Sequence, residues 1–146
     1  MFKLKVLFLA LFLPFIGFSQ NEIYVNVMLG GIDPYTDSIP VIVENFMFDT
    51  GASISAITPQ TYNNLKNINA ITSSSNAVLI KNADGRIVEM EIGVITFLGL
   101  TPNAIYDNIP VVILPEGSTD NLLGIDIISK FNSIEINFIN RTILWE

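Results

Sequence analysis

Short runs of β-branched and apolar residues, each bounded by turn-forming residues, fill most of this chain. Residues 23–29, 86–92 and 109–114 show the pattern most clearly, and no long stretch has the 3.6-residue spacing of an amphipathic helix. The chain has 146 residues, half of them apolar, which suits one domain with a substantial core. We therefore expect one mainly β domain with one or two short helices.

The first 20 residues have a different composition. A start that contains Lys3 and Lys5 precedes the apolar stretch 6–18, and the small residues Gly17 and Ser19 follow the pattern read by a signal peptidase. The stretch is short for a membrane span, and Pro14 interrupts it. We expect a signal peptide over 1–20, a single domain over 21–146, and export to the periplasm or the medium without stable membrane association. An uncleaved anchor is the alternative.

Acidic residues outnumber basic ones by 14 to 7, a net charge of −7. Loss of the expected leader would leave five basic residues and a net charge of −9. This balance argues against nucleic-acid binding and against attraction to an anionic membrane. The chain has no His and no Cys, so its core must suffice without disulfides, and hydrolysis based on His or Cys is excluded. We expect no metal and no cofactor.

Turn and cap signals divide the first half of the domain. The apolar runs 39–43 and 46–48 flank Glu44-Asn45, a spacing that predicts a tight hairpin. Thr58 and Pro59 predict a helix that continues to about Lys66, with Thr58 as its N-cap. Residues 67–76 are polar and are expected to form a loop.

The second half is expected to contain two hairpins and a short helix. Residues 77–81 and 86–92 flank a turn with Asp-Gly, which predicts the first hairpin. A short helix is expected over 126–131. The strands 133–138 and 142–145 are expected to pair with each other.

Asp49 is the residue whose position most suggests chemistry. It ends the apolar run 46–48, where a carboxylate is costly to bury unless it is hydrogen-bonded or shares its charge. A serine nucleophile is disfavoured because Ser53 and Ser55 have no His or Lys motif beside them. A catalytic carboxylate is the functional interpretation, and an Asp that only satisfies a turn is the structural one.

The stretch Phe48–Ser53 resembles the active-site loop of the aspartic proteases, and Leu122, Leu123 and Gly124 resemble the hydrophobic-hydrophobic-Gly motif that supports this loop. Order and spacing are similar to those of the single-domain, retropepsin-like members, including exported bacterial ones, over residues 36–145. The resemblance implies a closed retropepsin-like acid-protease β-barrel with a flap hairpin.

The resemblance also implies roles for single residues. Thr50 would hydrogen-bond to a partner loop, and Gly51 would let the backbone approach substrate closely. Ala52 would line the cleft. The flap tip, which would close over an extended peptide, would comprise Ala83, Asp84 and Gly85.

Peptide hydrolysis without a metal needs one group to deprotonate water and another to protonate the carbonyl oxygen. Two adjacent carboxylates that share one proton can do both. The chain has one Asp-Thr-Gly, so it supplies half of such a dyad. We therefore expect an aspartic endopeptidase that acts on peptides or proteins as a homodimer, with one Asp49 from each chain. The alternatives are a non-catalytic peptide-binding module of the same fold and a dimer with a purely structural role.

Two features depart from the viral members of that family. Their dimer uses a charged pair, an Arg after the supporting Gly and an Asp after Asp-Thr-Gly-Ala. Here Ile125 and Ser53 occupy these positions, so the charged pair is missing. The stretch 93–108 is also longer than its viral equivalent.

Overall fold

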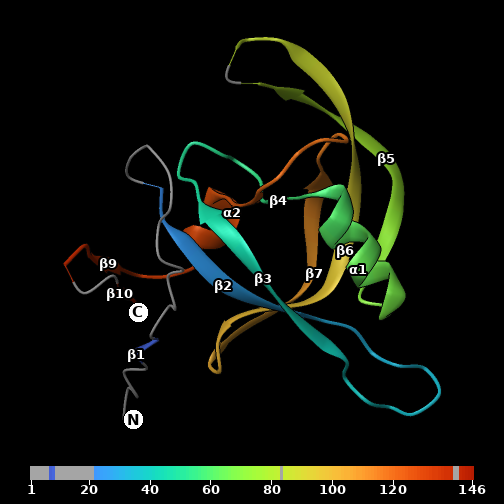
Figure 1. Ribbon diagram of the computed structural model, residues 1–146, viewed down its shortest axis with the longest axis horizontal. Coiled ribbons are helices and arrows are strands. Elements are labelled where there is room, and N and C mark those ends of the chain that lie inside the picture. Colours follow the sequence, from blue (N-terminus) through green and yellow to red (C-terminus); the bar gives the residue numbers. More distant parts are fainter. Residues whose placement is uncertain (1–6, 9–21, 83, 140–141) are drawn as a thin grey trace.

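A computed structural model describes residues 7–8, 22–82, 84–139 and 142–146 of the chain (Figure 1). Ala83 and all of the expected leader except Leu7 and Phe8 lie outside the described residues. The elements in chain order are β1 (Leu7–Phe8), β2 (Tyr24–Gly30), β3 (Val41–Phe48), β4 (Ala56–Ile57), α1 (Pro59–Asn67), β5 (Ile71–Lys81), β6 (Ile87–Thr101), β7 (Ala104–Ile113), β8 (Asn121–Leu123), α2 (Ile125–Ile128), β9 (Ile134–Asn137) and β10 (Thr142–Trp145).

Strands β2, β3, β8, β4, β7 and β6 form a closed barrel. Each pairs with the next in this order, and antiparallel pairing of residues 28–30 of β2 with 97–99 of β6 closes the ring. Among the described strands, β5 pairs only with β6 and lies outside the ring. The expected mainly β, closed barrel is therefore confirmed.

The predicted hairpin around Glu44-Asn45 is wrong. Strand β3 runs unbroken from Val41 to Phe48, and Glu44 and Asn45 pair with Val27 and Asn26 of β2. The polar pair lies inside a strand because the full-length pairing with β2 satisfies its backbone groups. The turn that joins β2 and β3 instead lies in residues 31–40.

The expected loop 67–76 is only partly a loop. Strand β5 begins at Ile71, and its register against β6 shifts between Ser73 and Ala77. The stretch 93–108, whose length departs from the viral pattern, forms most of the β6–β7 hairpin. The length of β6 lets one strand pair with β5, β7 and β2, so this stretch closes the barrel.

Both expected helices are present. Helix α1 begins as predicted, with the Thr58 hydroxyl accepting a hydrogen bond from the amide of Thr61 and Pro59 in its first turn. Helix α2 is shorter than the predicted 126–131 and starts one residue earlier, at Ile125. Neither described helix has the length and apolar character needed to cross a membrane.

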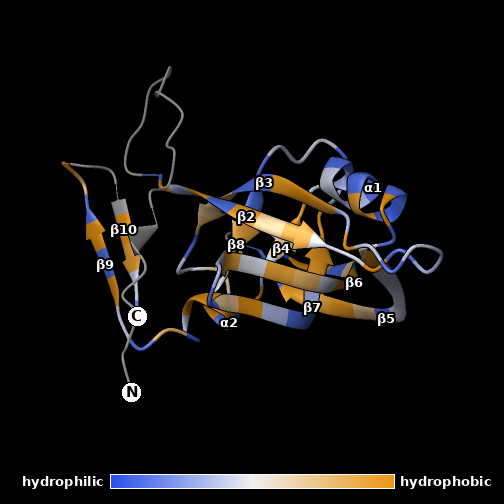
Figure 2. Cartoon of the chain, turned by 90° about the horizontal axis from the view of Figure 1, so that it is seen from below, coloured by the Kyte–Doolittle hydropathy of each residue, from blue (hydrophilic) through white to orange (hydrophobic). Residues whose placement is uncertain are grey.

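The core fills the barrel and continues to the C-terminal strands. Its fully buried side chains include Leu29, Phe46, Leu98 and Leu123. Strands β9 and β10 pair as predicted, and β1 pairs with the other edge of β10. Figure 2 shows this hairpin at one end of the barrel.

Aromatic rings connect the C-terminal hairpin to the strand that ends at Asp49. Trp145 lies 6.0 Å from the ring centroid of Phe48 and 4.7 Å from that of Phe131. Phe131 in turn meets Tyr106 of β7 edge to face. The C-terminal strand therefore packs directly behind the residue that precedes Asp49.

A buried amide joins three elements close to Asp49. The side chain of Asn121 in β8 accepts from the amide of Thr58 at 2.9 Å and donates to the carbonyl of Asn45 in β3 at 3.1 Å. Asn121 is only 6 % exposed; its bond from the Thr58 amide is buried, and its bond to Asn45 is partly buried. Asn121 thereby fixes the start of α1 against the β3–β8 pair.

Replacing Asn121 with Ala should destabilise the protein, because the buried amide of Thr58 loses its acceptor. We expect the free energy of unfolding in urea to fall by about 1–3 kcal/mol. Asn103→Ala, at the exposed β6–β7 turn, is the control and should stay within about 0.5 kcal/mol of wild type. Equal losses for the two variants would contradict this role of Asn121.

Candidate active site

Parallel pairing of β3 with β8 determines the position of Asp49. Met47 and Phe48 pair with Leu122 and Leu123, and the amide of Asp49 donates to the carbonyl of Leu123 at 3.0 Å. Two segments about 70 residues apart in the chain thus meet at the end of β3. The structure brings the predicted supporting motif next to Asp49.

The loop after β3 folds back on the Asp49 side chain. The Oδ1 atom of Asp49 accepts from the amide of Gly51 at 2.8 Å, and the carbonyl of Asp49 accepts from the amide of Ala52 at 3.3 Å. Asp49 is half-buried, whereas Thr50 and Gly51 are exposed. The loop therefore orients the carboxylate and leaves the Thr50–Gly51 segment facing solvent.

A side chain at Gly51 would crowd one neighbour, the Asp49 carboxylate. A Cβ atom at Gly51 would lie 3.1 Å from Oδ1 of Asp49. That contact would crowd the carboxylate that the Gly51 amide orients. The glycine is therefore explained by close approach to Asp49, in addition to the approach to substrate that the resemblance implies.

Gly124 lets the supporting segment approach the loop. A Cβ atom there would lie 2.7 Å from the carbonyl carbon of Ile54 and 2.9 Å from the carbonyl oxygen of Ala52. The next amide, of Ile125, donates to that same Ala52 oxygen at 2.8 Å. Backbone therefore packs on backbone here, and a larger residue at 124 would force the two segments apart.

Ser55 and Asp126 form a second connection that sequence analysis did not anticipate. The buried Ser55 hydroxyl donates to Oδ1 of Asp126 at 2.8 Å and accepts from the amide of Gly124 at 2.9 Å. Sequence reasoning addresses Ser55 only as a nucleophile, a role that it disfavours. The available signal was a hydroxyl inside the otherwise apolar run 54–57, which requires a buried partner.

A tyrosine and an acid connect β2 to the residue before β8. The Tyr24 hydroxyl donates to Oδ1 of Asp120 at 3.0 Å. Burial, together with the hydrogen bond to Asp120 and its negative charge, raises the pKa of Tyr24 to about 12. The hydroxyl therefore remains a donor throughout the acidic and neutral range.

The β5–β6 hairpin has the form expected of a flap and extends beyond the barrel at the top of Figure 1. In its turn the amide of Asn82 donates to the carbonyl of Arg86, and the amide of Gly85 donates to the carbonyl of Asn82. Gly85 has a φ of +84°, which favours glycine. Asp84 accepts from the Arg86 guanidinium, which lowers the pKa of Asp84. The described hydrogen bonds of Asp84 and Gly85 stay within this turn, and Ala83 lies outside the described residues.

Within the part of the chain that the structure describes, no group of three or more acidic, His or Cys side chains could hold a metal ion. The groups gathered at the site are one carboxylate oriented by an amide, two exposed loop residues and a glycine-based backbone contact. Such a carboxylate can take a proton from water or give one, but a single group cannot do both in the same step.

Replacing Ser55 with Ala should weaken the support of the active-site loop, because Gly124 and Asp126 both lose a buried partner. We expect the free energy of unfolding to fall by about 1–3 kcal/mol in a urea titration. Ser53→Ala, on the exposed side of the same loop, is the matched control and should cost less than about 0.5 kcal/mol. A loss at Ser53 as large as that at Ser55 would refute the assigned role.

Comparison with known proteins agrees with this geometry. The chain is similar over 85 % of its length, and over 81 % of the other chain, to the crystal structure of a retropepsin-like aspartic protease from Rickettsia conorii, with 18 % identity and a TM-score of 0.54. This likeness shows a shared fold. No curated protein matches the sequence. The family described as gag-polyprotein putative aspartyl protease matches residues 43–130, which include the Asp49 loop and the segment 122–124. The chain therefore belongs to this retropepsin-like family of aspartyl proteases.

Proposed function

We propose that this protein is an aspartic endopeptidase whose active unit is a homodimer, with Asp49 of each chain forming one catalytic dyad. The observation that carries the proposal is the half-buried Asp49 carboxylate, oriented by the Gly51 amide at the end of β3. Membership of an aspartyl protease family supports the same chemistry. The chain has one Asp-Thr-Gly, so a second chain supplies the second carboxylate.

In the proposed reaction a water molecule lies between the two Asp49 carboxylates, which share one proton. The unprotonated carboxylate takes a proton from the water while the water oxygen attacks the peptide carbonyl carbon. The protonated one gives its proton to the carbonyl oxygen. The amine nitrogen then takes the proton held by the first carboxylate, and a hydroxyl of the tetrahedral intermediate returns its proton to the second carboxylate as the C–N bond breaks. This leaves an amine, a carboxylic acid and a dyad that again holds one proton.

The surroundings of Asp49 fit contact with a second chain. Thr50 and Gly51 are exposed beside the carboxylate, and Ile125, next to the supporting glycine, is 40 % exposed. We infer that Thr50 bonds to the partner loop. We also infer that apolar contact through Ile125 replaces the charged pair of the viral enzymes.

The substrate in this proposal is an extended segment of a peptide or protein, covered by the β5–β6 flap. Ala52 would line the cleft, and residues 83–85 would exclude water above it. We further propose that residues 1–20 direct export and that the enzyme acts in the periplasm or outside the cell. The acidic surface fits a protein that stays in solution without nucleic-acid partners.

Asp49→Asn is the direct test of the chemistry, because the amide keeps the shape of the side chain and removes the acid. Peptide-library digestion between about pH 3 and 7 should show cleavage by the wild type and a loss of at least about 100-fold in the variant. Sedimentation should show both proteins as dimers.

The matched control for charge is Asp107→Asn, on the exposed face of β7, which should cleave like the wild type. A monomer that cleaves peptides, or cleavage that survives Asp49→Asn, would overturn the proposal. A dimer that binds peptides and cleaves none would instead show a non-catalytic peptide-binding module, and a dimer that does neither would show a structural role.

A further inference from the structure

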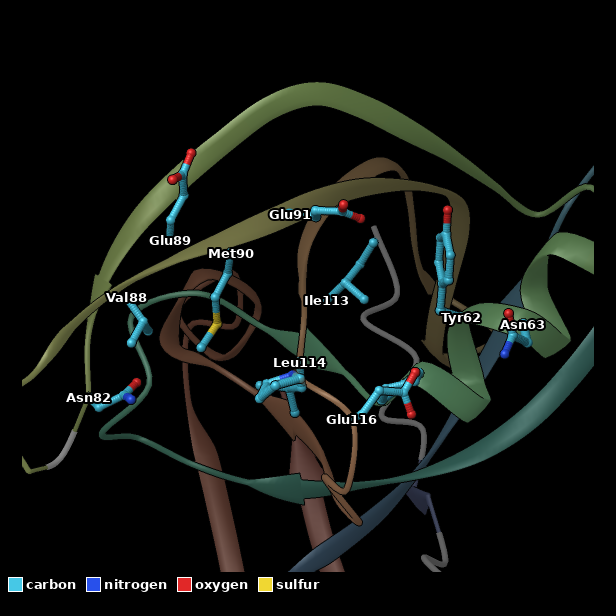
Figure 3. Close-up of a pocket in the computed structure, with 12 residues that line it drawn as sticks. Tyr62, Asn63, Asn82, Val88, Glu89, Met90, Glu91, Ile113, Leu114 and Glu116 are labelled. Atoms are coloured by element: carbon cyan, nitrogen blue, oxygen red, sulfur yellow. The ribbon is translucent and has the colours of Figure 1, made fainter.

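A cavity of about 660 Å³ lies between the flap, the N-terminal turn of α1 and the residues that follow β7 (Figure 3). Its size falls within the range of small-ligand sites. Asp49 does not line it. The cavity is therefore separate from the Asp49 carboxylate, and the chemistry of its own lining residues determines which kind of ligand it could bind.

The cavity connects to the active-site loop through β4. This strand begins at Ala56, directly after the loop, and pairs in parallel with the end of β7. The carbonyl of Ile57 accepts from the amide of Leu114, which lines the cavity, at 2.9 Å. The loop that carries Asp49 and the lining of the cavity are therefore joined through one short strand.

One wall of the cavity is apolar. Val88 and Met90 are two residues apart in β6 and therefore lie on the same face of the strand. In Figure 3 the Met90 side chain points toward Leu114. Together with Ile113 these side chains are only partly buried, although they are large and apolar. An aliphatic chain placed here would cover apolar surface that now faces the cavity.

Carboxylates lie at another part of the same lining. In Figure 3, Glu91 extends toward Tyr62, and Glu116 lies below that ring, whereas Glu89 points away from Leu114. None of the described lining residues is a Lys or Arg. Lys66 lies over the Tyr62 ring but does not line the cavity. An occupant would therefore meet an apolar wall and negative charge together.

We propose that this cavity binds a basic side chain of the substrate, so that the enzyme prefers peptides with Lys or Arg at the position that enters it. A long aliphatic stem can pack on Val88, Met90 and Leu114 while its charged end reaches one of the carboxylates of the same lining, Glu91 or Glu116. A purely apolar side chain would displace water from the carboxylates without replacing it. The inference rests on the proposed function only in that it requires a peptide in the cleft.

Binding without turnover tests the cavity by itself. The probes are fluorescein-labelled decapeptides of uncharged sequence, each with a single Lys at a different position. For every position, two matched peptides carry norleucine or Glu in place of that Lys. Their affinity for the Asp49→Asn variant is measured by fluorescence anisotropy. At one position or more we expect Lys to bind about three- to tenfold more tightly than norleucine, and Glu more weakly than both. High salt should reduce the difference.

The double variant Glu91→Gln/Glu116→Gln, in the same background, should abolish the preference for Lys. Asp107→Asn, which also removes negative charge but lies outside the cavity, should retain it. Norleucine binding as tightly as Lys at every position, or a Lys preference that survives the double variant, would overturn the inference. A Lys preference without cleavage by the wild type would keep the cavity and refute the endopeptidase. Cleavage by the wild type without a Lys preference would keep the endopeptidase and refute the cavity as a site for a basic side chain.

Discussion

The parallel pairing of β3 with β8 is the interaction on which the site depends. It closes one side of the barrel and places Asp49 beside Leu123, so the carboxylate stands on a strand whose backbone groups are paired. Gly124 and Ser55 extend this support into the loop by backbone packing and by a buried hydroxyl. Catalytic groups need such rigid surroundings, because small displacements at the reacting atoms cost large factors in rate.

This support belongs to one chain, but the chemistry proposed for it requires two. The carboxylate, the exposed Thr50–Gly51 segment and the partly exposed Ile125 gather at the same loop. The acid–base step needs a second carboxylate, and the apolar exposure suits a contact with another copy. Stoichiometry and chemistry are therefore linked in the proposed enzyme, because loss of the dimer would separate the two carboxylates of the dyad.

Local signals in the sequence were sufficient for much of the fold. Thr58-Pro59 marked the start of α1, Asp84-Gly85 marked the flap turn, and the resemblance gave the barrel and the adjacency of Asp49 to Leu122–Gly124. The failures had tertiary causes. Glu44-Asn45 looks like a turn but lies within β3 because β2 pairs along its whole length. The Ser55–Asp126 bond and the cavity under the flap join residues far apart in the chain, which no local pattern reveals.

In the proposed enzyme, each active site takes one Asp49 from each of two chains. Wild-type and Asp49→Asn chains can be unfolded together, refolded in varied ratios and assayed for peptide cleavage at constant total protein. The account predicts that activity follows the square of the wild-type fraction, so an equal mixture keeps about a quarter of the activity. Activity that falls in proportion to the wild-type fraction would show that one chain carries a complete site and would contradict the account.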